Sequence, residues 1–110
     1  MEIVWSPLAV DSLTAVIEYV TDNFGPAVAQ KTAERILSKI NKLADYPEIG
    51  VPDFELSRYR GVTVRHLVMP PNLVYYMIDN DVVVIVIVVH SKQSPKAIRK
   101  LVNDAIERKD

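Results

Sequence analysis

A histidine stands where a strongly apolar segment ends. Val82 to Val89 are eight consecutive β-branched apolar residues, and His90 follows them directly. An ordinary histidine titrates near pH ~6.5, so it can act as a general acid or base close to neutrality. A side chain at a strand end can leave the core, which makes His90 the leading candidate for acid–base chemistry. The alternative is a histidine that only hydrogen-bonds to neighbouring backbone.

Basic residues follow this histidine. Lys92, Lys96, Arg99 and Lys100 form a run that is a candidate for binding RNA or DNA. A charged, solvated helix face explains the last three equally well.

The halves of the chain also differ in charge. Residues 1–56 hold four Lys/Arg and nine Asp/Glu, and residues 57–110 hold nine and five, so the nets are −5 and +4. One surface could therefore meet an anion, unless the halves neutralise each other in the fold.

Length and composition limit the class of protein. A chain of 110 residues with 49% hydrophobic and 25% charged residues is typical of one globular domain, here residues 1–110. It has no cysteine, which excludes disulfides and thiolate metal sites, and we expect no metal or cofactor. No apolar run is long enough to cross a membrane, and the N-terminus lacks the pattern of a signal peptide. The default expectation is a cytoplasmic protein with no membrane partner.

The N-terminal half predicts a short strand and two helices. Residues 2–5 are mostly apolar and strand-like, and Ser6-Pro7 is typical of a helix start. Gly25-Pro26 separates the first helix from a second, which we expect to end by Pro47. Such a pair forms a helical hairpin. The apolar stripe expected on the first helix is Leu13, Val16, Ile17, Val20 and Phe24; that on the second is Ala29, Ala33, Ile36, Leu37, Ile40, Leu43 and Ala44.

The C-terminal half predicts strands and a final helix. Residues 47–53 read as a loop, and strand signals follow at 59–69, 73–78 and 82–89. The short turns at 70–72 and 79–81 make these three strands an antiparallel meander. Ser94-Pro95 begins a helix whose apolar stripe is Ile98, Leu101, Val102 and Ala105.

The predicted fold is α+β, an antiparallel sheet with the helical hairpin on one face, in the order β-α-α-β-β-β-α. Residues 82–89 do not alternate between apolar and polar, so both faces of that strand must be covered. We expect an inner strand with the C-terminal helix over its second face. A second copy of the chain or a partner protein is the other candidate cover.

Element order and motifs together resemble the RelE/ParE toxins of bacterial toxin–antitoxin modules. The resemblance covers roughly residues 3–93 and rests on "WSPLAVDSLTAVIEYV", "ILSKINKLADYPEIG" and "VRHLV…LVYYMIDNDVVVIVIVVHSKQ". It implies a toxin neutralised by a cognate antitoxin that wraps around it. RelE-like members cut messenger RNA on the ribosome without a metal, and ParE-like members poison DNA gyrase. A homodimer is an open alternative.

The resemblance also gives roles to individual residues. In a nuclease, His90 would be the catalytic acid or base and Arg65 would clamp the phosphate. Glu48 lies where some nuclease members carry an acidic base, although a loop glutamate is usually only solvated. We expect His66 to be a partly buried structural histidine. Tyr75 and Tyr76 are expected to pack in the core, with base stacking as the alternative.

Two departures favour the gyrase branch. Ribosome-dependent nucleases usually carry an arginine just before the second meander strand, where this chain has Pro71 and Asn72. They are also usually strongly basic, whereas the net charge here is −1. The preferred interpretation is a ParE-like gyrase inhibitor. The alternatives are a RelE-like nuclease and a non-toxic module that only binds a partner.

Overall fold

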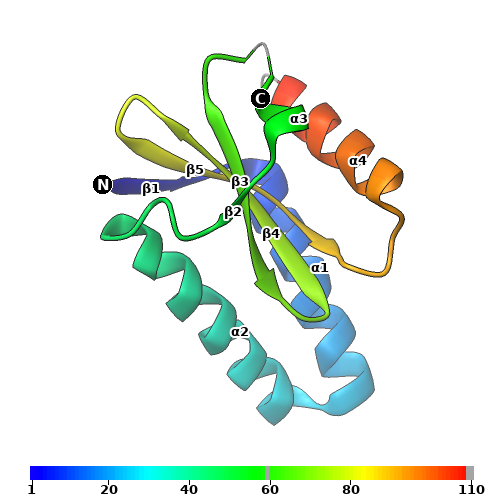
Figure 1. Ribbon diagram of the computed structural model, residues 1–110. Helices are drawn as coiled ribbons and strands as arrows, with labels where there is room; N and C mark the ends of the chain where they lie inside the picture. Colours follow the sequence, from blue (N-terminus) through cyan, green and yellow to red (C-terminus); the bar gives the residue numbers. More distant parts are fainter. Residues whose placement is uncertain (59, 109–110) are drawn as a thin grey trace.

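The computed structural model describes residues 1–58 and 60–108, and Figure 1 shows the arrangement of its elements. Tyr59, with which the predicted strand 59–69 would begin, lies outside the described residues. The elements in chain order are β1 (Glu2–Trp5), α1 (Pro7–Phe24), α2 (Pro26–Asn41), a 3₁₀ turn (Lys42–Ala44), β2 (Val51–Pro52), α3 (Phe54–Ser57), β3 (Thr63–Met69), β4 (Asn72–Asp79), β5 (Val82–His90) and α4 (Pro95–Glu107).

The five strands form one sheet in the order β1-β5-β4-β3-β2. Strands β2 to β5 pair in antiparallel fashion, as the predicted meander requires. The first strand, β1, instead joins β5 in parallel, so the sheet is mixed at that edge. The expected element order is confirmed, with β2 and α3 added within and just after the segment 47–53 that was expected to be a loop.

The inner position of β5 is confirmed, because β1 and β4 flank it. Figure 1 shows α2 and α4 on opposite sides of the strands. One core cluster joins the hairpin to the sheet through residues such as Ile36, Ile40 and Tyr76. A second joins α4 to the sheet through Ile98 and Val102. Both faces of β5 are therefore covered, which explains why its sequence does not alternate.

The helical hairpin forms as the sequence predicts, and its breaks have clear local causes. The Ser6 hydroxyl accepts a hydrogen bond from the Ala9 N–H at 3.0 Å and so caps α1. Gly25, with φ of +91°, ends α1 and begins α2 in a conformation that favours glycine. The second helix ends earlier than expected, at Asn41, because its last residues tighten into the 3₁₀ turn.

Three residues assigned to buried stripes are exposed instead. Phe24 lies at the end of α1, beyond the part of the helix that contacts the sheet, and is 62% exposed. Leu37 on α2 and Leu101 on α4 are also exposed, each at 40%. Phe24 and Leu101 become important below, because they line the same groove.

A β-bulge at Val86 divides β5. Tyr75 pairs with Ile87 and Tyr76 with Ile85, so Val86 has no partner residue on β4. Its carbonyl accepts a hydrogen bond of 3.0 Å from the Ser6 hydroxyl. Ser6, which caps α1, therefore also hydrogen-bonds the Val86 carbonyl at the bulge and holds the start of the helix against β5.

Candidate functional site

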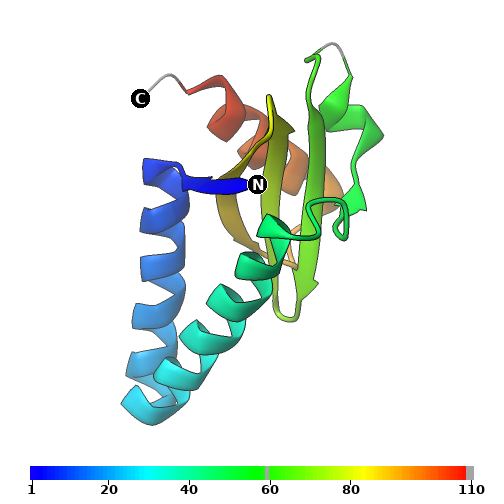
Figure 2. The same cartoon turned by 90° about the vertical axis from the view of Figure 1, so that its left-hand side faces the viewer.

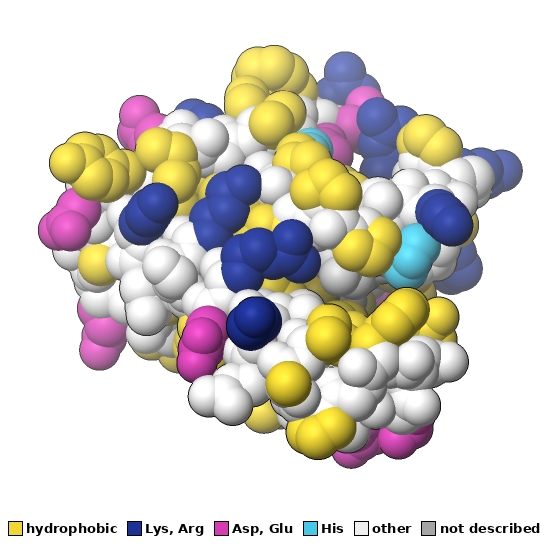
Figure 3. Space-filling model, turned by 90° about the horizontal axis from the view of Figure 1, so that it is seen from below, with side chains coloured by type: hydrophobic (Ala, Val, Ile, Leu, Met, Phe, Trp, Pro, Cys, Tyr) yellow, Lys and Arg dark blue, Asp and Glu magenta, His cyan; other side chains and the backbone are white. Residues whose placement is uncertain are grey.

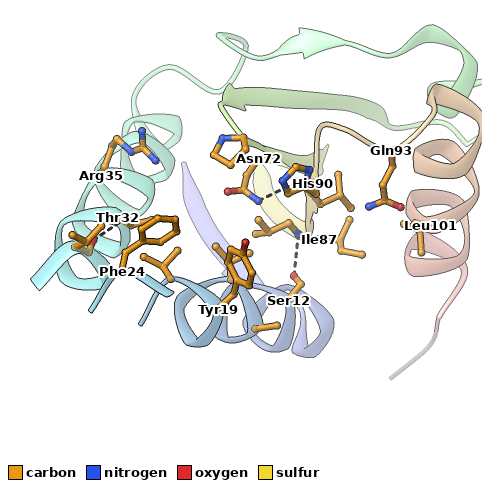
Figure 4. Close-up of a pocket in the computed structure, with 17 residues that line it drawn as sticks. Ser12, Tyr19, Phe24, Thr32, Arg35, Asn72, Ile87, His90, Gln93 and Leu101 are labelled. Atoms are coloured by element: carbon orange, nitrogen blue, oxygen red, sulfur yellow. Dashed lines mark hydrogen bonds between the residues drawn. The ribbon is translucent and has the colours of Figure 1, made fainter. Parts of the chain in front are cut away.

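An open groove of about 820 Å³ lies beside the end of β5 (Figure 4). Helices α1 and α2 form one wall. The first residue of β4 and the last residues of β5 form the floor, and α4 with the turn before it closes the other side. The lining residues are Ser12, Ala15, Val16, Tyr19, Val20, Phe24, Val28, Thr32, Arg35, Pro71, Asn72, Ile87, Val88, Val89, His90, Gln93 and Leu101.

The floor of the groove includes a strand edge. Strand β1 pairs only with residues 82–85 of β5, so residues 86–90 have β4 on one side and no neighbouring strand on the other. The Ser12 hydroxyl accepts a hydrogen bond from the Val88 N–H at 2.9 Å. Helix α1 thus takes up part of this edge, and the groove opens beyond it.

The groove walls are apolar although they face solvent. Tyr19, Phe24, Val28 and Leu101 are all exposed large hydrophobic residues that line it. Contiguous exposed apolar surface of this kind marks a binding site more often than it marks chance exposure. The groove therefore has the character of a site for an apolar segment of a partner.

A basic stripe borders this groove on α2. Lys31, Arg35 and Lys39 follow one another at steps of four and share one side of α2, and Lys42 continues the spacing into the 3₁₀ turn; Arg35 lines the groove. These four are all the Lys and Arg residues of positions 1–56. Basic side chains gather in the middle of the face shown in Figure 3. The net charge of −5 in this half conceals the stripe, and its spacing was the signal that could have revealed it.

His90 lines the groove at the end of β5, opposite Asn72 of β4. Its Nδ1 accepts a hydrogen bond from the Lys92 N–H at 3.1 Å, so the imidazole holds the turn that follows the strand. Asn72 is buried, and its side-chain amide donates to the Val89 carbonyl at 3.4 Å. Asn72, where the resemblance to ribosome-dependent nucleases would call for an arginine, thus carries a buried amide that supports the floor of the groove.

Arg65 lies away from His90. It is opposite Tyr76, four residues along β4 from the Asn72–His90 pair, which corresponds to roughly 13 Å of strand. Its guanidinium donates to the carbonyl oxygens of Glu48 at 3.1 Å and of Gly50 at 2.9 Å. The structure therefore does not bring the two predicted catalytic residues around one cleft. Arg65 fastens the loop before β2, and the backbone of Glu48, rather than its carboxylate, contacts it.

The other predicted residues have structural surroundings. Tyr75 and Tyr76 are buried in the two core clusters. Lys96, Arg99 and Lys100 are exposed on α4, and Lys100 pairs with Asp104 one turn later at 3.4 Å. Lys92 is exposed in the turn after β5, close to His90. None of the three basic residues on α4 lines the groove.

His66 is partly buried on β3, and its ring centroid lies 5.0 Å from that of Tyr75. Among the described residues, its buried Nδ1 has no hydrogen-bond partner. Burial lowers the pKa of His66 below its ordinary value, and the negative charge of Asp53 opposes this shift in part. The folded chain therefore favours the neutral form of the His66 imidazole.

This shift predicts a pH dependence of stability. Because the pKa of His66 is lower in the folded chain than in the unfolded chain, the unfolded chain binds the proton first as pH falls. The free energy of unfolding should therefore decrease as pH falls below about 6.5, the ordinary histidine value. Urea unfolding at pH 7.5 and pH 5.5 tests this, with His66→Leu showing a smaller loss than wild type. Equal losses in the two chains would contradict the assignment.

No group of three or more His, Cys, Asp or Glu side chains in residues 1–58 and 60–108 could hold a metal ion. Within the same part of the chain, no helix is long and apolar enough to cross a membrane. Together the sheet, the hairpin and the open apolar groove define a small α+β domain with an apolar groove beside the end of β5.

Comparisons with known proteins identify the family. The family model described as "ParE toxin of type II toxin-antitoxin system, parDE" matches residues 3–95. Toxin RelE2 of Caulobacter vibrioides is 34% identical over 91 residues, which cover 82% of this chain and 94% of that protein. A solved structure titled "Chromosomal ParDE TA system from P. aeruginosa" shares the fold, with a TM-score of 0.67 at 20% identity. The match covers 84% of this chain and 97% of that one.

The chain belongs to the ParE toxin family of type II toxin–antitoxin systems, within the RelE/ParE superfamily. The predicted class of protein is thereby confirmed, and membership of this family implies a cognate antitoxin as partner.

Proposed function

We propose that this chain is a ParE-like toxin that inhibits DNA gyrase. The observation that carries the proposal is the placement of Arg65, whose guanidinium is engaged by two loop carbonyls and lies away from His90. Metal-free RNA cleavage requires an acid, a base and cations around one phosphate. Arg65 and His90 do not supply that arrangement. The net charge of −1 and the match to the ParE model support the same branch.

A ribosome-dependent nuclease is the second candidate. Arg35 and His90 both line the groove, so one cation and one titratable group face the same space (Figure 4). The relative from Caulobacter vibrioides carries the name Toxin RelE2. In this alternative His90 would transfer the proton and Arg35, rather than Arg65, would meet the phosphate.

The groove is proposed as the site where the antitoxin neutralises the toxin. Its apolar walls suit apolar side chains of a partner segment, and Arg35, which lines it, suits acidic ones. The open edge of β5 at residues 86–90 offers backbone groups to an extended chain. The segment expected here is therefore amphipathic and acidic.

His90→Ala separates the two candidate targets. In a gyrase inhibitor we expect the variant to retain inhibition of supercoiling by purified gyrase, within about twofold of wild type. In a nuclease, loss of the acid or base should lower ribosome-dependent cleavage of messenger RNA by a factor of ~10²–10⁴. Both assays should be run on the same preparations. Cleavage by wild type that is lost in His90→Ala would overturn the gyrase proposal.

A further inference from the structure

A second exposed apolar surface lies along the β2 edge of the sheet, separate from the groove. Between positions 46 and 54 the chain exposes four large hydrophobic side chains, and Phe54 and Tyr46 are 80% and 64% exposed. In Figure 2 the loop, β2 and α3 lie on the right, away from α1 on the left. We call this the edge surface; its apolar residues are Tyr46, Ile49, Val51 and Phe54.

The loop within the edge surface is held tightly to the core. The Tyr76 hydroxyl donates to the Pro47 carbonyl at 2.7 Å and accepts from the Gly50 N–H at 2.9 Å. Arg65 adds two hydrogen bonds to carbonyl oxygens of the same loop. Gly50 packs directly on the Tyr76 ring, where a larger side chain would collide with it. The apolar side chains are therefore presented on a rigid support, which lowers the entropy cost of binding.

The segment 45–55 that carries the edge surface is itself net negative, although the Arg65 guanidinium contacts its backbone and the Met1 amino group contacts the residue before it. Asp45, Glu48 and Glu55 are exposed within it, and no Lys or Arg occurs between positions 43 and 57. Because its exposed charged side chains are carboxylates, the segment disfavours an anionic phosphate backbone or an anionic membrane. A protein face with apolar pockets and a rim of Lys or Arg would be complementary.

The groove and the edge surface differ in charge as well as in place. Arg35 of the basic stripe lines the groove, whereas the exposed charged side chains within the edge surface are carboxylates. An acidic antitoxin segment would suit the first and would be disfavoured at the second. One partner chemistry therefore does not fit both surfaces.

We propose that the edge surface is where this toxin docks on its cellular protein target, through a cationic, apolar face of that target. Phe54 is the central anchor, because large aromatic side chains contribute most to protein interfaces. This inference rests on the proposed function in one respect only, namely that the toxin acts by binding a macromolecular target. It does not depend on which target is correct.

The test measures binding of the full chain to purified DNA gyrase and, separately, to 70S ribosomes. Phe54→Ser should weaken binding to whichever target the wild type binds by at least about tenfold, the effect of losing an interface anchor. Glu48→Lys should weaken it more at low salt than at high salt. Val10→Ser is the control, because it also replaces an exposed apolar side chain with serine, but Val10 lies on α1 outside both surfaces. Affinity for the cognate antitoxin should stay within about twofold.

Each other outcome has a defined meaning. If Phe54→Ser weakens ribosome binding and the wild type does not bind gyrase, the edge surface stands and the gyrase proposal fails. If the wild type binds gyrase and Phe54→Ser binds equally well, the gyrase proposal stands and the edge surface is wrong. Loss of antitoxin affinity in Phe54→Ser, or loss of a self-association that sedimentation detects in the wild type, would assign the surface to the antitoxin or to a second copy. Wild-type binding to neither target would also overturn the proposal.

Discussion

Replacing Ala15 with Trp is expected to abolish neutralisation of this toxin by its antitoxin. Ala15 is an exposed residue of α1 that lines the groove, so an indole at this position would fill space in the proposed antitoxin site. Interface substitutions that block a central pocket cost several kcal/mol, and each 1.4 kcal/mol is about a tenfold change. We expect the affinity for the antitoxin to fall about 100-fold or more, measured by titration of the purified proteins.

The matched control for this prediction is Ala27→Trp. Ala27 is also an exposed alanine of the hairpin, near the start of α2, but it does not line the groove. This variant should bind the antitoxin as the wild type does. Arg35→Glu provides an independent variant, since it reverses a charge beside the groove without filling it, and should weaken binding more at low salt. Full neutralisation of Ala15→Trp would show that the antitoxin binds elsewhere.

Local signals in the sequence predicted most of the fold. Ser6-Pro7 and Ser94-Pro95 start α1 and α4 as expected, and each serine caps its helix. Asn80 and Asp81 both adopt positive φ in the two-residue turn between β4 and β5. These features depend on a few neighbouring residues, so they can be recognised without knowing the rest of the structure.

Features that depend on distant parts of the chain could not be predicted in this way. Val51–Pro52 is a strand only because it pairs with Arg65 and His66. The bulge at Val86 is stabilised by Ser6, 80 positions earlier. Phe24 satisfied the apolar spacing of α1, yet the helix extends past the sheet there and leaves it exposed.

The candidate site was predicted only in part. His90 was expected at a strand end and lines the groove there, although its role is untested. Arg65 was expected to lie beside His90. The order of the strands along the chain does not fix which of their side chains share a cleft, and Arg65 lies elsewhere. The groove itself combines residues from α1, α2, β4, β5 and α4, and no single segment indicates it. The basic stripe of α2 was readable from its spacing, because that pattern is local to one helix.

Replacing Val102 with Asp should unfold the chain or make it associate. Val102 on α4 is fully buried in the cluster that covers one face of β5, where it packs with residues such as Tyr75 and Val86. A carboxylate at this position would lose its hydration without gaining a partner. We expect the free energy of unfolding to fall by about 3–5 kcal/mol, a large part of the stability of a typical domain of this size.

Leu101→Asp is the matched control, because this neighbouring residue on α4 is exposed and a charge there stays in water. Urea unfolding should show little change for this variant, and sedimentation should show the wild-type state of assembly.

Deleting residues 94–110 should have a stronger effect than Val102→Asp. The deletion uncovers the whole face and leaves apolar surface of β4 and β5 open to a second copy or to the antitoxin. If the truncated chain stayed monomeric and as stable as the full chain without a partner, then α4 would not be the cover that the unalternating sequence of β5 requires.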